Sequence, residues 1–205
     1  MTLAQRGARL TTAISVRSPL GWRVCRPAFR RYFDRLASRW DGIITPDDLA
    51  ALTAALAGLP APPHRVLDVG TGTGAAAFLV ANTFPQAEVV GVDVSARMVS
   101  LAAAKAKTID RLAGRVRFIE ADAARLPLPD GAYDLITLSN MIPFFDEIAR
   151  VLASSGTVLI SFAEGTSTPI WVSSKRLQDE LAKRGFTLFA ESNGGAATCL
   201  SARRP

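Results

Sequence analysis

The chain has 205 residues, of which 49% are hydrophobic, and its formal net charge is +6. We expect one domain with a full hydrophobic core, because this length has no room for a second enzyme domain. Two cysteines and a single histidine exclude a disulfide framework and a tetrahedral metal site, which indicates metal-free chemistry in a reducing, cytoplasmic compartment.

The surplus of positive charge lies at the N-terminus, where residues 1–40 carry nine arginines and one acid, Asp34. Residues 1–25 lack a sustained periodicity and contain Pro19-Leu20-Gly21, so we expect a basic, flexible arm. A basic arm can be a solvated leader, which we favour, or it can bind nucleic acid or an anionic membrane. No stretch of the sequence is apolar for long enough to span a bilayer.

Residues 27–42 carry an aromatic stripe at helical spacing that includes Tyr32, Phe33 and Trp40. A second helix should begin after Thr45, with Thr45 as its N-cap and a proline at its first position, and should run to about residue 59. We therefore assign residues 26–60 to N-terminal helices and residues 61–205 to a core.

The stretch RVLDVGTGTGAAAFLVA, residues 65–81, predicts a strand, a tight turn and a helix. Gly70, Gly72 and Gly74 would let the backbone approach a ligand that any Cβ would push away. Asp68, two residues before this turn, could hold the N–H groups of the loop or the ammonium group of an amino-acid ligand.

A second acid supports a nucleotide-type site. The segment VVGVDVS, residues 89–95, is an apolar strand that ends at Asp93, where a carboxylate can accept hydrogen bonds from a ribose diol. Dinucleotides and S-adenosylmethionine both fit this pattern. The glycines follow G-x-G-x-G rather than G-x-G-x-x-G, and neither Tyr32 nor Tyr133 is followed four residues later by a lysine, so we disfavour a dinucleotide.

The rest of the chain alternates helices and strands, which predicts a single doubly wound α/β domain with a mostly parallel, seven-stranded sheet. The last two strands, joined through Asn193-Gly194-Gly195, should form an antiparallel hairpin at its edge. His64 precedes the first strand, at the end opposite the ligand edge, so we reject it as a catalytic base. Helices are expected over 74–82, 95–108, a segment ending near 152, and 170–184, and further strands over 88–92, 116–120, 133–138, 157–162, 186–191 and 196–201.

Four sequence blocks occur in a familiar order: VLDVGTGTG, GVDVSARMVSLA, FIEADAARLPLPDGAYDLIT, and EIARVL followed by GTVLIS. Through them, residues 66–162 resemble the class I S-adenosylmethionine-dependent methyltransferases, especially the ubiquinone/menaquinone-biosynthesis-like branch. The resemblance implies a Rossmann-like methyltransferase domain over residues 26–205, with residues 26–60 as a lid and S-adenosylmethionine as cofactor. The family usually has Lys-Pro-Gly-Gly where this chain has Ala-Ser-Ser-Gly, residues 153–156, in a turn away from the cofactor.

The resemblance also implies roles for individual residues. Asp122 would accept a hydrogen bond from the exocyclic amine of adenine, although it could instead cap a short turn. Met98 could pack beside the adenine ring or belong to the ordinary core. The expected cofactor-binding residues are Asp68, Gly70, Gly72, Gly74, Asp93, Met98, Asp122, Ala123 and Ser139, and the expected substrate pocket is formed by Tyr32, Phe33, Trp40, Asn140, Phe144 and Phe145.

The implied function is transfer of the methyl group of S-adenosylmethionine to a small, apolar or aromatic molecule. Two alternatives stay open: an RNA-modifying methyltransferase that grips its substrate with the basic arm, and a non-catalytic cofactor-binding subunit. Asp41, Asp146 and Glu164 are the acids that could reach the mouth of the site and take a proton. We assign no catalytic residue, no metal ligand and no oligomeric state from the sequence.

Overall fold

The computed structural model describes residues 19–205, with side chains from residue 21 onward. Seven strands form one sheet in the order β3-β2-β1-β4-β5-β7-β6. Neighbouring strands among β1 to β5 are parallel, whereas β7 is antiparallel to β5 and β6 is antiparallel to β7. The predicted doubly wound sheet and its antiparallel C-terminal hairpin are thus confirmed. The strands are β1 (Arg65–Val69), β2 (Glu88–Asp93), β3 (Val116–Glu120), β4 (Tyr133–Ser139), β5 (Leu152–Phe162), β6 (Leu188–Gly194) and β7 (Ala197–Arg203).

Helices cover both faces of the sheet because the strands are apolar on both sides. In β1, Val66 belongs to one buried cluster together with residues of α3 and α4. Its neighbours Leu67 and Val69 belong to a second cluster on the opposite face, together with residues of α6 and α7. The helices are α2 (Pro19–Leu36), α3 (Ala50–Ala57), α4 (Ala75–Thr83), α5 (Ala96–Lys107), α6 (Phe145–Val151) and α7 (Ser174–Ala182), with 3-10 helices η1 (Ala37–Gly42), η2 (Pro46–Leu49), η3 (Asp110–Leu112) and η4 (Gly165–Ser167).

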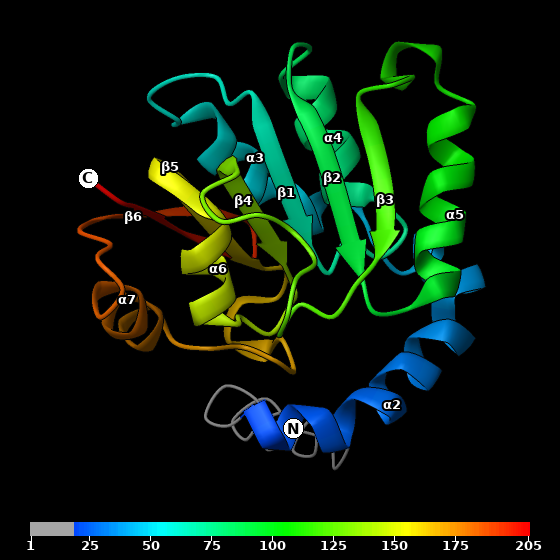
Figure 1. Ribbon diagram of the computed structural model, residues 1–205, viewed down its shortest axis with the longest axis horizontal. Coiled ribbons are helices and arrows are strands. Elements are labelled where there is room, and N and C mark those ends of the chain that lie inside the picture. The colour runs from blue at the N-terminus through cyan, green and yellow to red at the C-terminus, as the bar shows by residue number, and fades with distance from the viewer. Residues whose placement is uncertain (1–18) are drawn as a thin grey trace.

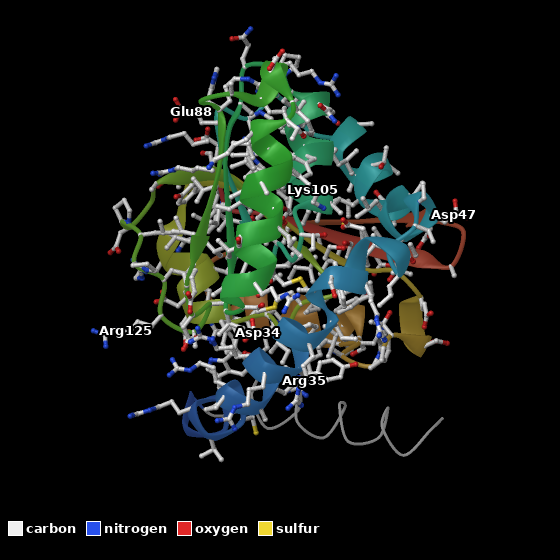
Figure 2. All side chains as sticks on the ribbon, turned by 90° about the vertical axis from the view of Figure 1, so that its right-hand side faces the viewer. Asp34, Arg35, Asp47, Glu88, Lys105 and Arg125 are labelled. Carbon is white, nitrogen blue, oxygen red and sulfur yellow. The ribbon has the colours of Figure 1, made fainter. Side chains whose placement is uncertain are left out.

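The helix α2 lies across the end of the sheet at which the arrows of β1, β2 and β3 point (Figure 1). Figure 2 shows Asp34 and Arg35 of α2 at the opposite end of the molecule from Glu88, the first residue of β2. Ligands of open α/β sheets bind at the carboxyl ends of the strands, so α2 covers the edge where a ligand is expected. None of the described helices is both long and apolar enough to cross a membrane.

The first correction concerns the predicted arm, residues 1–25. Residues 1–18 lie outside the described part of the chain, but residues 19–25 are helical and belong to α2. Trp22 is only 2% exposed and contacts Phe29, seven residues later, with ring centroids 5.6 Å apart. The aromatic stripe therefore starts earlier than predicted. The helix contains Pro27, which has no backbone N–H to donate.

The second correction concerns the lid, predicted to extend over residues 26–60. Thr45 and Pro46 start the second helical segment as expected, and the carboxylate of Asp48 accepts hydrogen bonds from the backbone N–H and the hydroxyl of Thr45. The helix that follows, α3, does not cover the ligand edge. It packs against β5, β6 and β7 with Leu52 and Leu56 buried, because an Ala- and Leu-rich helix has no polar face to present to water.

Element boundaries near the C-terminus also differ from the prediction. The strand β5 begins at Leu152 instead of residue 157, immediately after α6, and the hairpin strands lie one to three residues later than expected. The last helix is shorter than the predicted range 170–184, because Ser173 caps it by accepting a hydrogen bond from the N–H of Arg176. Ile170 thus lies outside the helix, and it lines a cavity described below.

If α3 belongs to the core, Leu52→Ala should lower the free energy of unfolding by about 2–5 kcal/mol, because it removes a fully buried side chain and leaves a void. Urea denaturation of the purified variant measures this change. The neighbouring exposed residue provides the control, since Thr53→Ala should change stability by about 0.5 kcal/mol or less. Equal effects of the two substitutions would contradict the assignment of α3 to the core.

Candidate functional site

The glycine loop between β1 and α4 is fixed by hydrogen bonds to the neighbouring strand. The N–H groups of Gly70 and Thr71 both donate to the carbonyl oxygen of Val92, at 2.8 and 2.9 Å. Gly70 has φ +73°, and a Cβ there would lie 2.7 Å from the sulfur of Met141. The backbone conformation therefore favours glycine at this position, and a Cβ would also displace the side chain of Met141.

Asp93, at the end of β2, joins two segments of the site. One carboxylate oxygen accepts the N–H of Gly72 at 2.9 Å, and the other accepts the N–H of Ser95 at 2.9 Å. Burial raises the pKa of Asp93 above its ordinary value, while these N–H donors favour the charged form. Each oxygen keeps a further lone pair, so the carboxylate can still accept hydrogen bonds from a ligand.

Asp68 is buried beneath the glycine loop, with 1% of its surface exposed. One of its oxygens accepts a hydrogen bond from the hydroxyl of Thr137 at 2.8 Å. The other oxygen and the hydroxyl of Thr71 have no hydrogen-bond partner among the described residues. Burial raises the pKa of Asp68 to about 6. A buried carboxylate oxygen without a donor is costly, so this corner of the site is suited to a ligand that brings hydrogen-bond donors.

Two adjoining cavities lie at the carboxyl edge, between the sheet and the N-terminal helices. The inner cavity has a volume of about 80 Å³ and the outer one of about 750 Å³. They share Phe29, Phe33, Trp40, Asn140 and Ile170 as lining residues. The inner cavity borders the glycine loop and Asp93, whereas the outer one opens between α2, the residues after η1 and the segment after β5.

Most of the predicted site residues meet at these cavities. The predicted residues that line the inner cavity are Phe33, Trp40, Gly70, Gly72, Asp93, Met98, Ala123, Ser139 and Asn140. Tyr32 lines the outer one, together with the shared residues. Met98 is both a core residue, 1% exposed, and part of the cavity wall, so its two alternative roles coincide. The predicted residues that line neither cavity are Asp68, Gly74, Asp122, Phe144 and Phe145.

The prediction for Phe145 is wrong. Phe145 is the first residue of α6 and is buried in the core, where the guanidinium of Arg184 lies 5.4 Å from its ring centroid. An α-helix that begins at this residue turns its side chain toward the sheet and away from the cavities. Phe144 stands behind the inner cavity, in edge contact with Trp22 at a centroid distance of 5.2 Å.

Asp122 is engaged by the N-terminal helix. Its carboxylate accepts hydrogen bonds from Nε1 of Trp22 and from the guanidinium of Arg26, both at 2.7 Å. The same carboxylate accepts the N–H of Ala124 at 3.0 Å, so the predicted turn-capping role is also present. The acceptor assigned to a ligand amine is therefore held by an indole N–H of the chain itself.

The sequence analysis missed several apolar wall residues of the inner cavity: Trp22, Phe29, Met141, Ile142 and Ile170. The spacing of Trp22, Phe29 and Phe33 on one helical stripe was a usable signal for the first two. The residues that follow β4 and precede α7 offered none, because the tertiary fold alone brings these loops to the cavity.

The three candidate acids occupy different environments. Asp41 is paired with Lys105 at 2.8 Å and also accepts the hydroxyl of Thr73. Asp146 is paired with Arg184 at 2.7 Å and lines neither cavity. Glu164 lines the outer cavity. Only one of the three candidates thus faces a cavity.

His64 lies at the amino end of β1, as predicted. Its carbonyl oxygen accepts the N–H of Glu88 at 2.8 Å, and Figure 2 shows Glu88 at the end of the molecule opposite α2. The described residues contain no group of three or more histidine, cysteine, aspartate or glutamate side chains that could hold a metal ion.

The titration of Asp68 should make stability depend on pH. The pKa of this carboxyl is about 6 in the folded chain and near 3.8 when exposed, so between these values the folded state binds more protons than the unfolded state. The free energy of unfolding therefore falls as the pH rises from about 4 to 6, because Asp68 loses its proton more readily in the unfolded chain than in the folded one. Relative to wild type, Asp68→Asn should be more stable at pH 7.5 than at pH 4.5 by about 1–3 kcal/mol. Urea denaturation at both pH values tests this, with the exposed Asp47→Asn as control; an equal difference at both pH values would contradict it.

The comparisons with known proteins agree with this geometry. Residues 66–159 match a family model described as a methyltransferase domain. The demethylmenaquinone methyltransferase of Thermus thermophilus is 40% identical over 105 residues, which cover 48% of this chain and 46% of that protein. The ubiquinone/menaquinone biosynthesis C-methyltransferase of Syntrophotalea carbinolica is 35% identical over 155 residues, which cover 67% of this chain and 62% of that protein. The chain thus spans about half the length of the first relative and under two thirds of the second.

The fold comparison gives the same result. A solved S-adenosylmethionine-dependent methyltransferase from Aquifex aeolicus matches with a TM-score of 0.67 at 20% sequence identity, covering 82% of this chain and 98% of that one. At this identity the match shows the fold, while the sequence matches show the branch. Residues 66–159 are therefore a methyltransferase domain of the class I S-adenosylmethionine-dependent type, related in sequence to the ubiquinone/menaquinone branch.

Proposed function

We propose that this protein transfers the methyl group of S-adenosylmethionine to a small, apolar or aromatic acceptor. The observation that carries the proposal is the pair of adjoining cavities at the carboxyl edge. The inner one borders the glycine loop and Asp93, and the outer one is walled by aromatic side chains. Such an arrangement suits a polar methyl donor beside an apolar acceptor.

The residues present fit the donor molecule. The unpartnered oxygen of the buried Asp68 carboxylate suits a ligand ammonium or N–H group once the inner cavity opens, and Gly70 has a φ of +73°, which favours glycine. Asp93 would accept from the ribose hydroxyls, and Asp122 with Ala123 would face the adenine. When bound, the donor supplies a sulfonium methyl already activated for displacement. The chain supplies alignment and excludes water.

Binding requires α2 to move. The inner cavity, at about 80 Å³, is smaller than the 300–1,000 Å³ typical of small-molecule pockets. Trp22 narrows it and holds the acceptor oxygen of Asp122. Opening of α2 would enlarge the cavity, and a ligand amine would replace the indole N–H on this carboxylate.

The outer cavity supports an apolar or aromatic acceptor. It has a volume of about 750 Å³, and its walls include Phe29, Tyr32, Phe33, Trp40 and Ile44. The two relatives described above are named for methylation in menaquinone and ubiquinone biosynthesis, which favours a quinone-like ring system over RNA. The basic residues 1–18 lie outside the described structure and contribute nothing to this choice.

Substitution of Asp93 tests the cofactor site. Asp93→Ala should weaken binding of S-adenosylhomocysteine by about 1–3 kcal/mol, because it removes a charged acceptor from a partly desolvated cleft. Isothermal titration calorimetry measures the affinity. His64→Ala, at the other end of β1, is the control and should leave the affinity unchanged. If the two variants ranked in the opposite order, the cofactor would not lie at this edge.

The tryptophan fluorescence tests the movement of α2. Addition of S-adenosylhomocysteine should shift the emission of the wild-type protein, because Trp22 loses its hydrogen bond to Asp122. Trp40 also lines the cavities, so Trp40→Phe is made in every protein compared, and most of the remaining shift should disappear when Trp22→Phe is added. Trp171→Phe is the matched control, since Trp171 lines neither cavity, and it should keep the shift. A full response in Trp22→Phe would show that the ligand binds without displacing this side chain.

A further inference from the structure

The acids at the carboxyl edge differ in whether their carboxylates have partners. Six of them accept hydrogen bonds or form ion pairs within the described residues: Asp34, Asp41, Asp68, Asp93, Glu120 and Asp122. Asp48, which lines the outer cavity, is held by the backbone N–H and hydroxyl of Thr45. The carboxylate of Glu164 has no such partner in the described part of the chain, so its oxygens are available to a ligand.

The backbone around Glu164 is nevertheless well fixed. Its N–H donates to the hydroxyl of Thr168 at 3.1 Å, and the N–H of the preceding Ala163 donates to the side-chain oxygen of Asn140 at 2.9 Å. Asn140 follows β4 and lines both cavities. The backbone of Glu164 is therefore held close to Asn140, which both cavities share, and its exposed side chain lines the outer cavity, where it can meet a proton donor.

The side chain of Glu164 is exposed, and the outer cavity that it lines holds two further titratable groups. The titratable groups that share the outer cavity with it are Tyr32 of α2 and Asp48 of η2. Among the described residues that line this cavity there is no histidine, lysine or arginine. An acceptor hydroxyl in this cavity would therefore meet one free carboxylate, that of Glu164.

We propose that Glu164 is the catalytic residue that accepts a proton from a hydroxyl group of the methyl acceptor, an inference that rests on the proposed function. The O–H proton passes to a carboxylate oxygen of Glu164. The electron pair left on the acceptor, on its oxygen or on a conjugated ring carbon, forms the bond to the methyl carbon. The bond from sulfur to that carbon breaks, and its electron pair stays on sulfur.

Methyl transfer to 1,4-naphthalenediol, followed as formation of S-adenosylhomocysteine, tests this role. Glu164→Gln should lower kcat by about 100-fold or more and change KM little. Glu164→Asp, which keeps a carboxylate, should restore part of the rate. Asp146→Asn removes an acid that is paired with Arg184 outside both cavities, and it should behave as wild type. A wild-type rate in Glu164→Gln would overturn the proposal.

The binding of a phenol tests the role of Glu164 without methyl transfer. In the complex with S-adenosylhomocysteine, 4-nitrophenol should bind in its neutral form, because the Glu164 carboxylate accepts its O–H and repels its phenolate. The absorbance of the phenolate should show a higher pKa for the bound phenol in wild type and in Asp146→Asn than in Glu164→Gln, where only desolvation raises it. The same pKa in all three proteins, or no binding to wild type, would overturn the role of Glu164. Loss of S-adenosylhomocysteine binding in wild type would instead overturn the proposed function.

Discussion

The site depends on the carboxyl end of β2, where a single strand terminus organises two loops. The carbonyl of Val92 accepts two N–H groups of the glycine loop, and the carboxylate of Asp93 joins Gly72 to Ser95. A negative charge beside the first turn of α5 is also favourable to the dipole of that helix. Because these hydrogen bonds need no ligand, the backbone that would surround a cofactor is already in place before one binds.

The two N-terminal helical segments are held by different forces, which explains their different roles. The helix α3 is attached by buried leucines in the core. The helix α2 is attached to the ligand edge by polar contacts, among them Trp22 and Arg26 to Asp122 and Arg30 to Glu120, and by the buried ring of Trp22 against Phe144. The partly exposed ion pairs contribute little net stability, so the main cost of detaching α2 is the exposure of Trp22.

The division into two cavities separates the two halves of the proposed chemistry. Phe33, Trp40 and Asn140 line both cavities and so stand at their junction. Aromatic walls there exclude water from the point of methyl transfer. The acids on the inner side are buried or paired, and the burial of Asp68 has a cost in stability that a purely structural role would not justify. The glycine loop and Asp93 thus border the inner cavity, where the donor would lie, and aromatic side chains wall both cavities.

The sequence by itself determined the sheet, its hairpin and the residues of the glycine loop, because strand periodicity, turn glycines and the terminal acids are local features. It also determined Asp93 as an acceptor at the ligand edge and the position of His64 away from it. Only the tertiary structure decided that Trp22 is part of α2 and bound to Asp122, that Phe145 faces the core, and that Glu164 is the candidate acid lining a cavity. These facts depend on contacts between segments distant in sequence, such as the 100 residues that separate Trp22 from Asp122, and no local pattern encodes them.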